Sequence, residues 1–329
     1  MIKSYIYRLK VSGQMKQRFA ITGGAGFIGS HFTAELLKAG HSVLVIDNYC
    51  SGTKNHIEPF RENTNFNFEL LNVEETENLT PLLSEIDTVI HLASNPDIAK
   101  SVSEPRIDFT QGTALTESLV EASRRAKVKN ILYASGSGVY GDVGETVLFE
   151  TSQMNPISTY GASKLAGEAL LSSYSYMFGI KTLSFRFANV VGNMQTHGVG
   201  YDFLQKLNKD NRHLEILGDG NQRKSYIHVT DVVSGVLTAF TKSIELNSVF
   251  NVSTSDVLSV TEIAHLAIEV FGLKSKLVEF RYAGGDRGWK ADVPVVRLNS
   301  DKLSSLGWSA KYTSRSAMKN ALTAMYEKL

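Results

Sequence analysis

The chain has 329 residues, of which 43% are hydrophobic and 20% charged, and its formal net charge is +1. This composition predicts a soluble globular protein long enough for one large domain and a smaller one. The nearly balanced charge gives no electrostatic reason to expect nucleic acid or an anionic membrane as a partner. The single cysteine, Cys50, excludes an internal disulfide and a site built from several thiolates.

The chain carries no sign of a membrane segment or an export signal. No run approaches the roughly 18 apolar residues of a membrane span, and the first residues lack the apolar core of a signal peptide. We therefore expect a cytoplasmic protein without a membrane partner. Met15 stands where a chain start is expected, just before the first strand, so residues 1–14 are predicted to be a disordered extension.

Short apolar, β-branched runs alternate with helical segments from Arg18 to about Val190. The predicted strands read RFAIT, SVLVID, FNFELL, DTVIHLAS, NILYAS and KTLSFRFANV. A representative helix covers Phe27 to Ala39, where apolar residues share one face and Gly40 follows as a stop. This alternation predicts an α/β fold with a doubly wound parallel sheet over residues 15–190.

The pattern becomes mixed after Val190. We predict a helix at Tyr201 to Asn208, a short strand at LEILG, and helices after Thr230, Thr261 and Thr313. Residues 191–329 are therefore expected to form most of a smaller lobe, interleaved with the larger domain and facing it across a cleft.

The stretch TGGAGFIGS follows the first strand directly and opens a helix, which is the context in which such glycines indicate a dinucleotide site. Gly23 permits the tight turn, Gly26 lets the backbone approach a diphosphate, and Gly29 allows close packing of helix on strand. Asp47 ends the second strand, where a carboxylate accepts hydrogen bonds from ribose hydroxyls and repels a 2′-phosphate. The pattern predicts NAD rather than NADP.

Tyr160 and Lys164 lie one turn apart in STYGASKLAGE, so their side chains reach the same site. A free tyrosine has a pKa of about 10 and is a poor base at neutral pH. A nearby ammonium and the positive ring of NAD⁺ have the sign of charge that stabilises a phenolate. The pair therefore predicts a tyrosine base assisted by a lysine.

Several motifs together resemble one family: TGGAGFIGS, Asp47, HLAS, VYG, YGASK and RFANVVG. Over residues 16–329 the chain resembles the extended short-chain dehydrogenase/reductases, specifically the NAD-dependent nucleotide-sugar epimerases and dehydratases with a Rossmann domain. The later stretches THGVGYDFLQKL, LEILGDGNQRKSYIHVTD and GGDRGWKADVP are similar to archaeal-type UDP-glucose 4-epimerases.

The resemblance implies epimerisation of a UDP-sugar at C4 through a 4-keto intermediate. In that reaction NAD⁺ takes the hydride, Tyr160 takes the O4 proton, and Lys164 binds the cofactor ribose. It also implies that residues 191–329 mainly bind the nucleotide sugar, with Asn189, Lys224 and Arg287 contacting its diphosphate. A further implication is pairing into a homodimer through two helices. The implied cofactor contacts are Gly23, Gly26, Phe27, Ile28, Gly29, Asp47, Asn48, Ser51, Gly52, Asn72, Val73, Leu92, Ala93, Ser94, Tyr160 and Lys164.

The sequence departs from the family at a catalytic position. The usual serine or threonine stands four residues before the tyrosine of VYG, where this chain has Gly136. Ser137 or Ser135 is expected to replace that hydroxyl, with Ser137 preferred because it lies beyond the strand, unless neither acts. Two further departures concern the cofactor: Asn72 where aspartate is usual, and Phe109 where asparagine is.

Two other readings stay open. Dehydratases of the family place an acid pair just before VYG, and decarboxylases a glutamate, whereas this chain has Ser137 and Gly138. Another nucleotide-sugar oxidoreductive enzyme (a dehydratase, reductase or decarboxylase) is thus disfavoured, and a weakly active protein that binds NAD and a nucleotide sugar is the second alternative. The eight histidines show no metal-ligand spacing, so no metal is expected.

Overall fold

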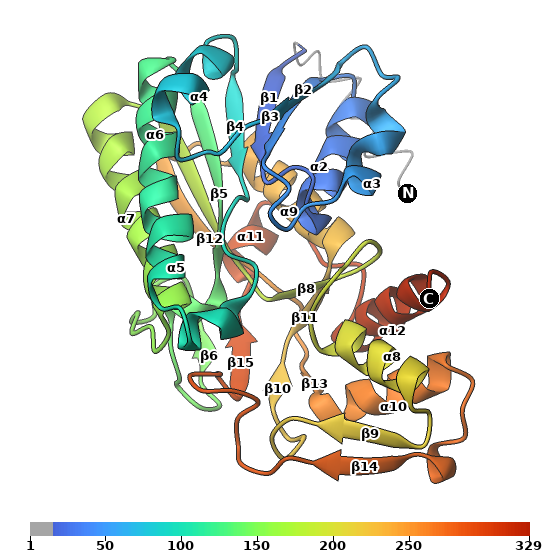
Figure 1. The fold of residues 1–329 in the computed structure, drawn as a ribbon. Helices are drawn as coiled ribbons and strands as arrows, with labels where there is room; N and C mark the ends of the chain where they lie inside the picture. Colours follow the sequence, from blue (N-terminus) through green and yellow to red (C-terminus); the bar gives the residue numbers. More distant parts are fainter. Residues whose placement is uncertain (1–15) are drawn as a thin grey trace.

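The computed structural model describes residues 16–329, and its largest element is a seven-stranded parallel sheet (Figure 1). From one edge to the other its strands are β12 (Asn247–Val252), β7 (Lys181–Phe187), β5 (Asn130–Gly136), β4 (Thr88–His91), β1 (Arg18–Thr22), β2 (Ser42–Asp47) and β3 (Phe66–Leu70). The strand order runs outward in both directions from β1 and β4, which confirms the doubly wound α/β fold. The predicted extension at 1–14 lies outside the described residues.

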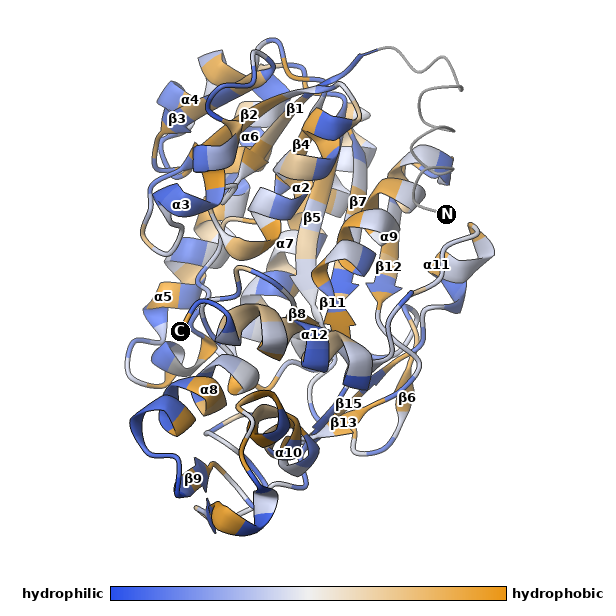
Figure 2. Cartoon of the chain, turned by 90° about the vertical axis from the view of Figure 1, so that its right-hand side faces the viewer, coloured by the Kyte–Doolittle hydropathy of each residue, from blue (hydrophilic) through white to orange (hydrophobic). Residues whose placement is uncertain are grey.

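Helices cover both faces of this sheet (Figure 1). One face carries α2 (Phe27–Lys38) and α9 (Val229–Lys242), and the other carries α4 (Thr76–Leu83), α6 (Leu115–Arg125) and α7 (Thr159–Phe178). Phe32 of α2 and Leu119 of α6 are both fully buried, and Figure 2 shows the apolar colouring that runs along the strands between these layers. Within the described residues, no helix combines the length and apolar character that crossing a membrane requires.

The edge strand β12 is absent from the sequence prediction, which found the other six. Its residues read NSVFNV, and two of its polar residues, Ser248 and Asn251, are buried rather than exposed. Asn251 is fully buried, donates from Nδ2 to the backbone oxygens of Leu148 and Asn299 at 3.0 Å each, and accepts the Tyr140 hydroxyl at 2.7 Å. Hydrogen-bonded asparagine thus interrupts the apolar run that marks a buried strand.

The smaller lobe lies beyond the carboxyl ends of the sheet and contains short strands and helices (Figure 1). A four-stranded sheet has the order β13 (Leu258–Ser259), β10 (Arg223–Lys224), β15 (Val295–Leu298), β6 (Val147–Leu148). The paired strands are β8 (Asn189–Val191) with β11 (Tyr226–His228), and β9 (His213–Ile216) with β14 (Glu279–Tyr282). The helices are α8 (Val199–Lys209), α10 (Val260–Val270) and α12 (Ser314–Tyr326), with buried Phe203, Ile263 and Leu322 between them.

The two parts of the chain are interleaved. β6 comes from the first half and joins the small sheet, whereas α9 and β12 come from the second half and complete the large one. The remaining short elements are α3 (Lys54–Ile57), η1 (Glu58–Phe60), η2 (Ile98–Val102), α5 (Arg106–Asp108), the π-helical η3 (Phe109–Ala114), η4 (Ser137–Val139), η5 (Ser275–Leu277) and α11 (Asp301–Ser305). The expected helix at Tyr201 to Asn208 corresponds to α8, and LEILG to β9.

A buried ion pair joins α7 to β7 beneath the sheet's carboxyl edge. The guanidinium of Arg186, 2% exposed, donates to the carboxylate of Glu168 at 2.6 and 2.9 Å. The same carboxylate accepts the Ser135 hydroxyl at 2.5 Å, and the same guanidinium donates to the Tyr140 hydroxyl at 2.9 Å. The Glu168 carboxylate raises the pKa of Arg186 against the opposing effect of burial. The pair connects β5, α7 and β7 in one network.

Replacing Arg186 with Met should lower the free energy of unfolding by about 3–5 kcal/mol, because the buried Glu168 carboxylate loses its ion-pair partner. Chemical denaturation measures this change. The matched control is Arg18→Met, whose exposed pair with Glu85 is expected to contribute less than about 1 kcal/mol. Equal effects of the two substitutions would contradict this reading of the network.

Candidate active site

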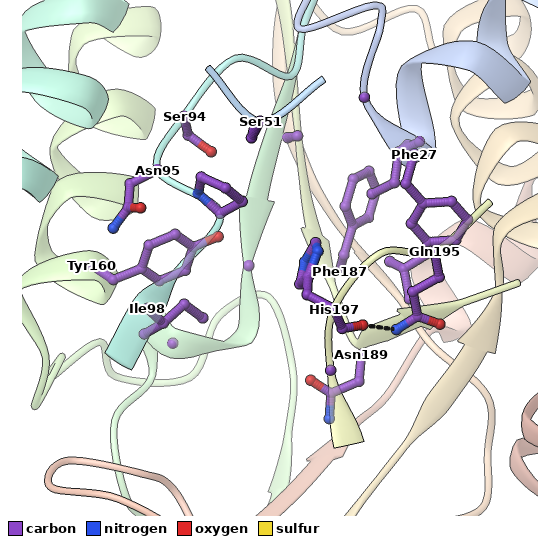
Figure 3. Close-up of a pocket in the computed structure, with 18 of the residues that line it drawn as sticks. Phe27, Ser51, Ser94, Asn95, Ile98, Tyr160, Phe187, Asn189, Gln195 and His197 are labelled. Carbon is purple, nitrogen blue, oxygen red and sulfur yellow. Dashed lines mark hydrogen bonds between the residues drawn. The ribbon is translucent and has the colours of Figure 1, made fainter. Parts of the chain in front are cut away.

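A cleft of about 890 Å³ lies where the carboxyl ends of β1, β2, β4, β5 and β7 meet the smaller lobe. Figure 3 shows its two walls. Asn95, Ile98 and Tyr160 project from one side, Phe27, Phe187 and His197 from the other. This is the edge at which open α/β sheets bind ligands.

The glycine loop between β1 and α2 forms one end of the cleft. Gly23 has a φ of +69°, and a Cβ there would lie 2.8 Å from the Ala93 backbone nitrogen. A Cβ on Gly29 would lie 2.5 Å from the Gly23 carbonyl oxygen, so helix and strand approach as closely as expected. Gly26 caps α2 without a side-chain hydrogen bond, which leaves the first N–H groups of that helix for a ligand.

The carboxylate of Asp47 braces this loop from the end of β2. Its two oxygens accept the backbone N–H groups of Ala25 at 2.9 Å and Tyr49 at 2.7 Å. Burial raises the pKa of Asp47, and these hydrogen bonds oppose the shift. Each oxygen keeps a second lone pair, so the group that shapes the phosphate loop can also accept a ribose hydroxyl.

Nearly all the residues expected at the cofactor site line this cleft. They are Gly23, Gly26, Phe27, Ile28, Gly29, Asp47, Asn48, Ser51, Asn72, Val73, Leu92, Ala93, Ser94, Tyr160 and Lys164. The exception is Gly52, which packs against the glycine loop, since a Cβ there would lie 2.9 Å from the Ala25 carbonyl carbon. Phe109, expected near the cofactor, is instead 56% exposed and does not line the cleft.

Tyr160 and Lys164 face the cleft from the first turns of α7. This helix begins at a Ser158 cap, whose hydroxyl accepts the Gly161 N–H at 3.0 Å. The ammonium of Lys164 donates to the Ala134 carbonyl oxygen at 2.9 Å and lies 5.5 Å from the centre of the Tyr160 ring. The phenol hydroxyl of Tyr160 points into the cleft (Figure 3). The two side chains therefore meet at one site, as their spacing predicts.

Burial sets the charge of this pair in the protein alone. It raises the pKa of Tyr160 to about 12, with a further contribution from the carboxylate of Asp108, and it lowers the pKa of Lys164 to about 8. Asp108 is itself buried and accepts hydrogen bonds from the Asn95 amide at 2.9 Å and the Thr159 hydroxyl at 2.7 Å. Sequence reasoning missed this carboxylate, which has no motif of its own.

The hydroxyls of Ser135 and Ser137 have different surroundings. Ser135 is 3% exposed and donates to Glu168, so its hydroxyl serves the buried ion pair. Ser137 begins η4 and lines the cleft, and its hydroxyl has no hydrogen-bond partner among residues 16–329. A Cβ on Gly136 would lie 4.0 Å from the Tyr160 hydroxyl with nothing closer, so this position leaves open space beside the phenol.

The residues expected to contact a diphosphate differ in position. Asn189 begins β8 and projects into the cleft (Figure 3). Lys224 lines the cleft, but its ammonium pairs with Asp292 at 2.5 Å. Arg287 does not line the cleft, and its guanidinium pairs with Asp142 at 2.6 Å. Both expected cations are therefore already paired with carboxylates.

Further cleft residues carry no motif that sequence reasoning recognised. Gln222 is 3% exposed, and neither polar atom of its amide has a partner among the described residues. Trp289 and His197 also line the cleft. Among residues 16–329, no three His, Cys, Asp or Glu side chains are arranged to bind a metal ion.

Comparison with known proteins places the chain in a family. Residues 19–253 match the NAD dependent epimerase/dehydratase family. The chain belongs to this family. A putative UDP-glucose 4-epimerase of Methanocaldococcus jannaschii is 30% identical over 310 residues, which cover 93% of this chain and 97% of the relative. The similarity to archaeal-type relatives is thus confirmed.

Solved structures of family members superpose over nearly the whole chain. UDP-glucose 4-epimerase of Thermotoga maritima, solved with UDP-glucose, is 30% identical with a TM-score of 0.85 and covers 94% of this chain and 99% of its own. UDP-glucose 4-epimerase of Thermus thermophilus, solved with NAD, is 29% identical with a TM-score of 0.84 and covers 95% and 100%.

The cleft fits the NAD that the family uses. The glycine cradle leaves no room for side chains at Gly23 and Gly29, and the Asp47 carboxylate stands at the end of β2 beside it. A cofactor diphosphate would meet the N-terminus of α2, and a ribose would meet Asp47. These features favour NAD over a dinucleotide with a 2′-phosphate.

Replacing Asp47 with Asn should weaken NAD binding about 10- to 100-fold, the range expected when a charged acceptor is lost. The affinity ratio of NAD to NADP should fall as well, because the repulsion of a 2′-phosphate disappears. Titration calorimetry with both cofactors measures these changes. Glu69→Gln, an exposed carboxylate change on neighbouring β3, is the control. An unchanged ratio would rule out Asp47 as the discriminating residue.

Proposed function

We propose that this protein interconverts UDP-glucose and UDP-galactose by NAD-dependent epimerisation at the sugar C4. The observation that carries the proposal is the position of the Tyr160 phenol and the Lys164 ammonium at one end of a cleft that also contains the glycine cradle. The names of the similar relatives support the nucleotide and the sugar.

Tyr160 is the proposed base. Bound NAD⁺ supplies the hydride acceptor and, once reduced, the hydride donor. While the C4 hydrogen leaves, Tyr160 accepts the proton of the O4 hydroxyl, and it returns this proton when the 4-keto sugar is reduced on its other face. Lys164 stabilises the phenolate through its charge and is oriented by the Ala134 carbonyl oxygen.

The sugar nucleotide is anchored by its diphosphate while the hexose turns. We infer that Asn189 contacts this diphosphate from β8, together with the backbone N–H groups at the start of α8, where Gly198 caps the helix without a side-chain bond. Lys224 contributes in spite of its pairing with Asp292, whereas Arg287 would first have to leave Asp142.

A dehydratase or decarboxylase is disfavoured because those reactions need acids beside the keto sugar. The two residues before VYG in this role are Ser137 and Gly138, neither of which is acidic. The absent hydroxyl at Gly136 favours one alternative, a binding protein with weak turnover. We also propose that the protein forms a homodimer, which the family resemblance supports, and that it is cytoplasmic, as expected for a chain without a predicted membrane segment.

Tyr160→Phe should lower turnover of UDP-galactose to UDP-glucose by at least about 10²–10⁴-fold, the usual contribution of a positioned base. Bound NAD should remain, because the glycine cradle and Asp47 are unchanged. Chromatographic analysis of the sugar nucleotides measures the rate. Tyr174→Phe on the same helix is the control, since that hydroxyl contacts Glu121 away from the cleft. Activity of Tyr160→Phe near that of the parent would sink the assignment of the base.

Ser137→Ala should lower the rate about 10²-fold, as for other single donors at an oxyanion. Adding Gly136→Ser to that variant should recover much of the loss, because the extended backbone at 136 (φ −156°) accepts a side chain and its Cβ would face the Tyr160 hydroxyl. Ser135→Ala should instead reduce thermal stability.

If Ser137→Ala retains full activity, no hydroxyl at this turn assists Tyr160. A parent protein that binds NAD and UDP-sugars without turnover would favour the binding-protein alternative.

A further inference from the structure

The wall opposite Tyr160 presents a histidine. His197 belongs to the segment between β8 and α8, and its imidazole projects into the cleft below Phe187 (Figure 3). The phenol of Tyr160 projects into the same cleft from the other side. A ligand that occupies the space beside the phenol is therefore bounded by His197 on its far side.

The backbone that carries His197 includes a residue in an energetically unfavourable conformation. Met194 has a φ of +71°, a left-handed value that is uncommon for a residue with a side chain, and Gly198 follows with a φ of +99°. Such conformations persist where the surrounding structure determines them, and they concentrate at functional sites. We infer that the surrounding structure determines the backbone conformation of this segment.

Two contacts from outside the segment and one within it keep the segment in place. The backbone oxygen of Asn193 lies 3.0 Å from Nε2 of His31 on α2, and its side-chain oxygen accepts from Lys328 at 2.8 Å. Within the segment, the amide of Gln195 donates to the His197 backbone oxygen at 2.7 Å. The imidazole is consequently presented to the cleft from a braced backbone.

The ring has hydrogen-bonding capacity that the protein does not use. Nδ1 lies 3.4 Å from the Thr196 hydroxyl, while Nε2 has no partner among residues 16–329. Desolvation by the surrounding protein lowers the pKa of His197, with Asp97 opposing it, which favours the neutral ring. A neutral imidazole has one donor and one acceptor, so the ring can both give and take a hydrogen bond.

We propose that His197 hydrogen-bonds a hydroxyl of the hexose and holds the sugar against Tyr160. This inference rests on the proposed function. On the Tyr160 side the chain has glycine at 136, so this position offers the sugar no side-chain hydrogen bond. A ring nitrogen on the far wall supplies a partner from the other direction. Because neutral imidazole both donates and accepts, it can meet a hydroxyl in either orientation of the turned sugar.

Binding measurements on His197→Phe and His197→Gln test the contact without requiring turnover. Calorimetry on the NAD-loaded protein should show that His197→Phe binds UDP-galactose roughly tenfold more weakly, the effect of about one hydrogen bond, and binds UDP as the parent does. His197→Gln keeps a donor and an acceptor and should retain more of the affinity. Turnover of His197→Phe should fall about 10²-fold, as expected for a misplaced sugar.

The controls separate a sugar contact from a change in folding. His213→Phe makes the same substitution at a histidine that pairs with Asp210 away from the cleft, and it should change neither affinity. NAD content and the thermal midpoint of each variant report on folding. Parent-like binding of UDP-galactose by His197→Phe, or an equal loss for UDP, would overturn the proposal. A parent that binds UDP-galactose without converting it would overturn the proposed function and leave this contact testable.

Discussion

The geometry of the cleft depends on the buried ion pair between Glu168 and Arg186. Glu168 lies one turn beyond Lys164 on α7, and Arg186 lies on β7 directly before the residues that lead to Asn189. A carboxylate at this depth is stable only with its cation, so the two elements are fixed relative to each other. Ser135 extends the constraint to β5. The ion pair therefore fixes the positions of the Tyr160 phenol on α7 and of Asn189 after β7 relative to each other. Local helix propensity alone would not fix them.

Whether the Tyr160 phenol can act as a base depends on the charges around it. In the protein alone, burial and the Asp108 carboxylate both favour the protonated phenol of Tyr160, whose pKa is about 12. Burial also lowers the pKa of Lys164 to about 8, so the ammonium has only a modest margin of charge at neutral pH. Lowering the pKa of the phenol then requires additional positive charge beside it, and each unit requires about 1.4 kcal/mol. We therefore expect Tyr160 to act as a base only when a further positive charge, in addition to Lys164, occupies the cleft. Without that charge the phenol stays protonated.

The features that the sequence predicted are those encoded within a few neighbouring residues. The glycine loop, Asp47, and the Tyr160–Lys164 pair follow from local spacing, and the structure brings them together. The state of Lys224 and Arg287 was not predictable, because their partners Asp292 and Asp142 lie 68 and 145 residues away in the chain. Strand β12 escaped notice since its asparagines are buried by hydrogen bonds that only the folded chain supplies. His197 depends on a left-handed Met194 that no pattern signals.

The two walls of the cleft are held in place by different interactions. The wall with Tyr160, Lys164 and Ser137 belongs to the large sheet and is held by the ion pair beneath it. The wall with His197 belongs to a segment held by α2 and the end of the chain. Glycine at 136 offers the sugar no side-chain hydroxyl on the first wall, so the contact proposed for His197 would help to orient the sugar from the second wall. In the proposed epimerisation the 4-keto sugar must rotate between its two alcohol forms. The proposed base, Tyr160, would stay fixed during this rotation, while the contact proposed for His197 could exchange one sugar hydroxyl for another.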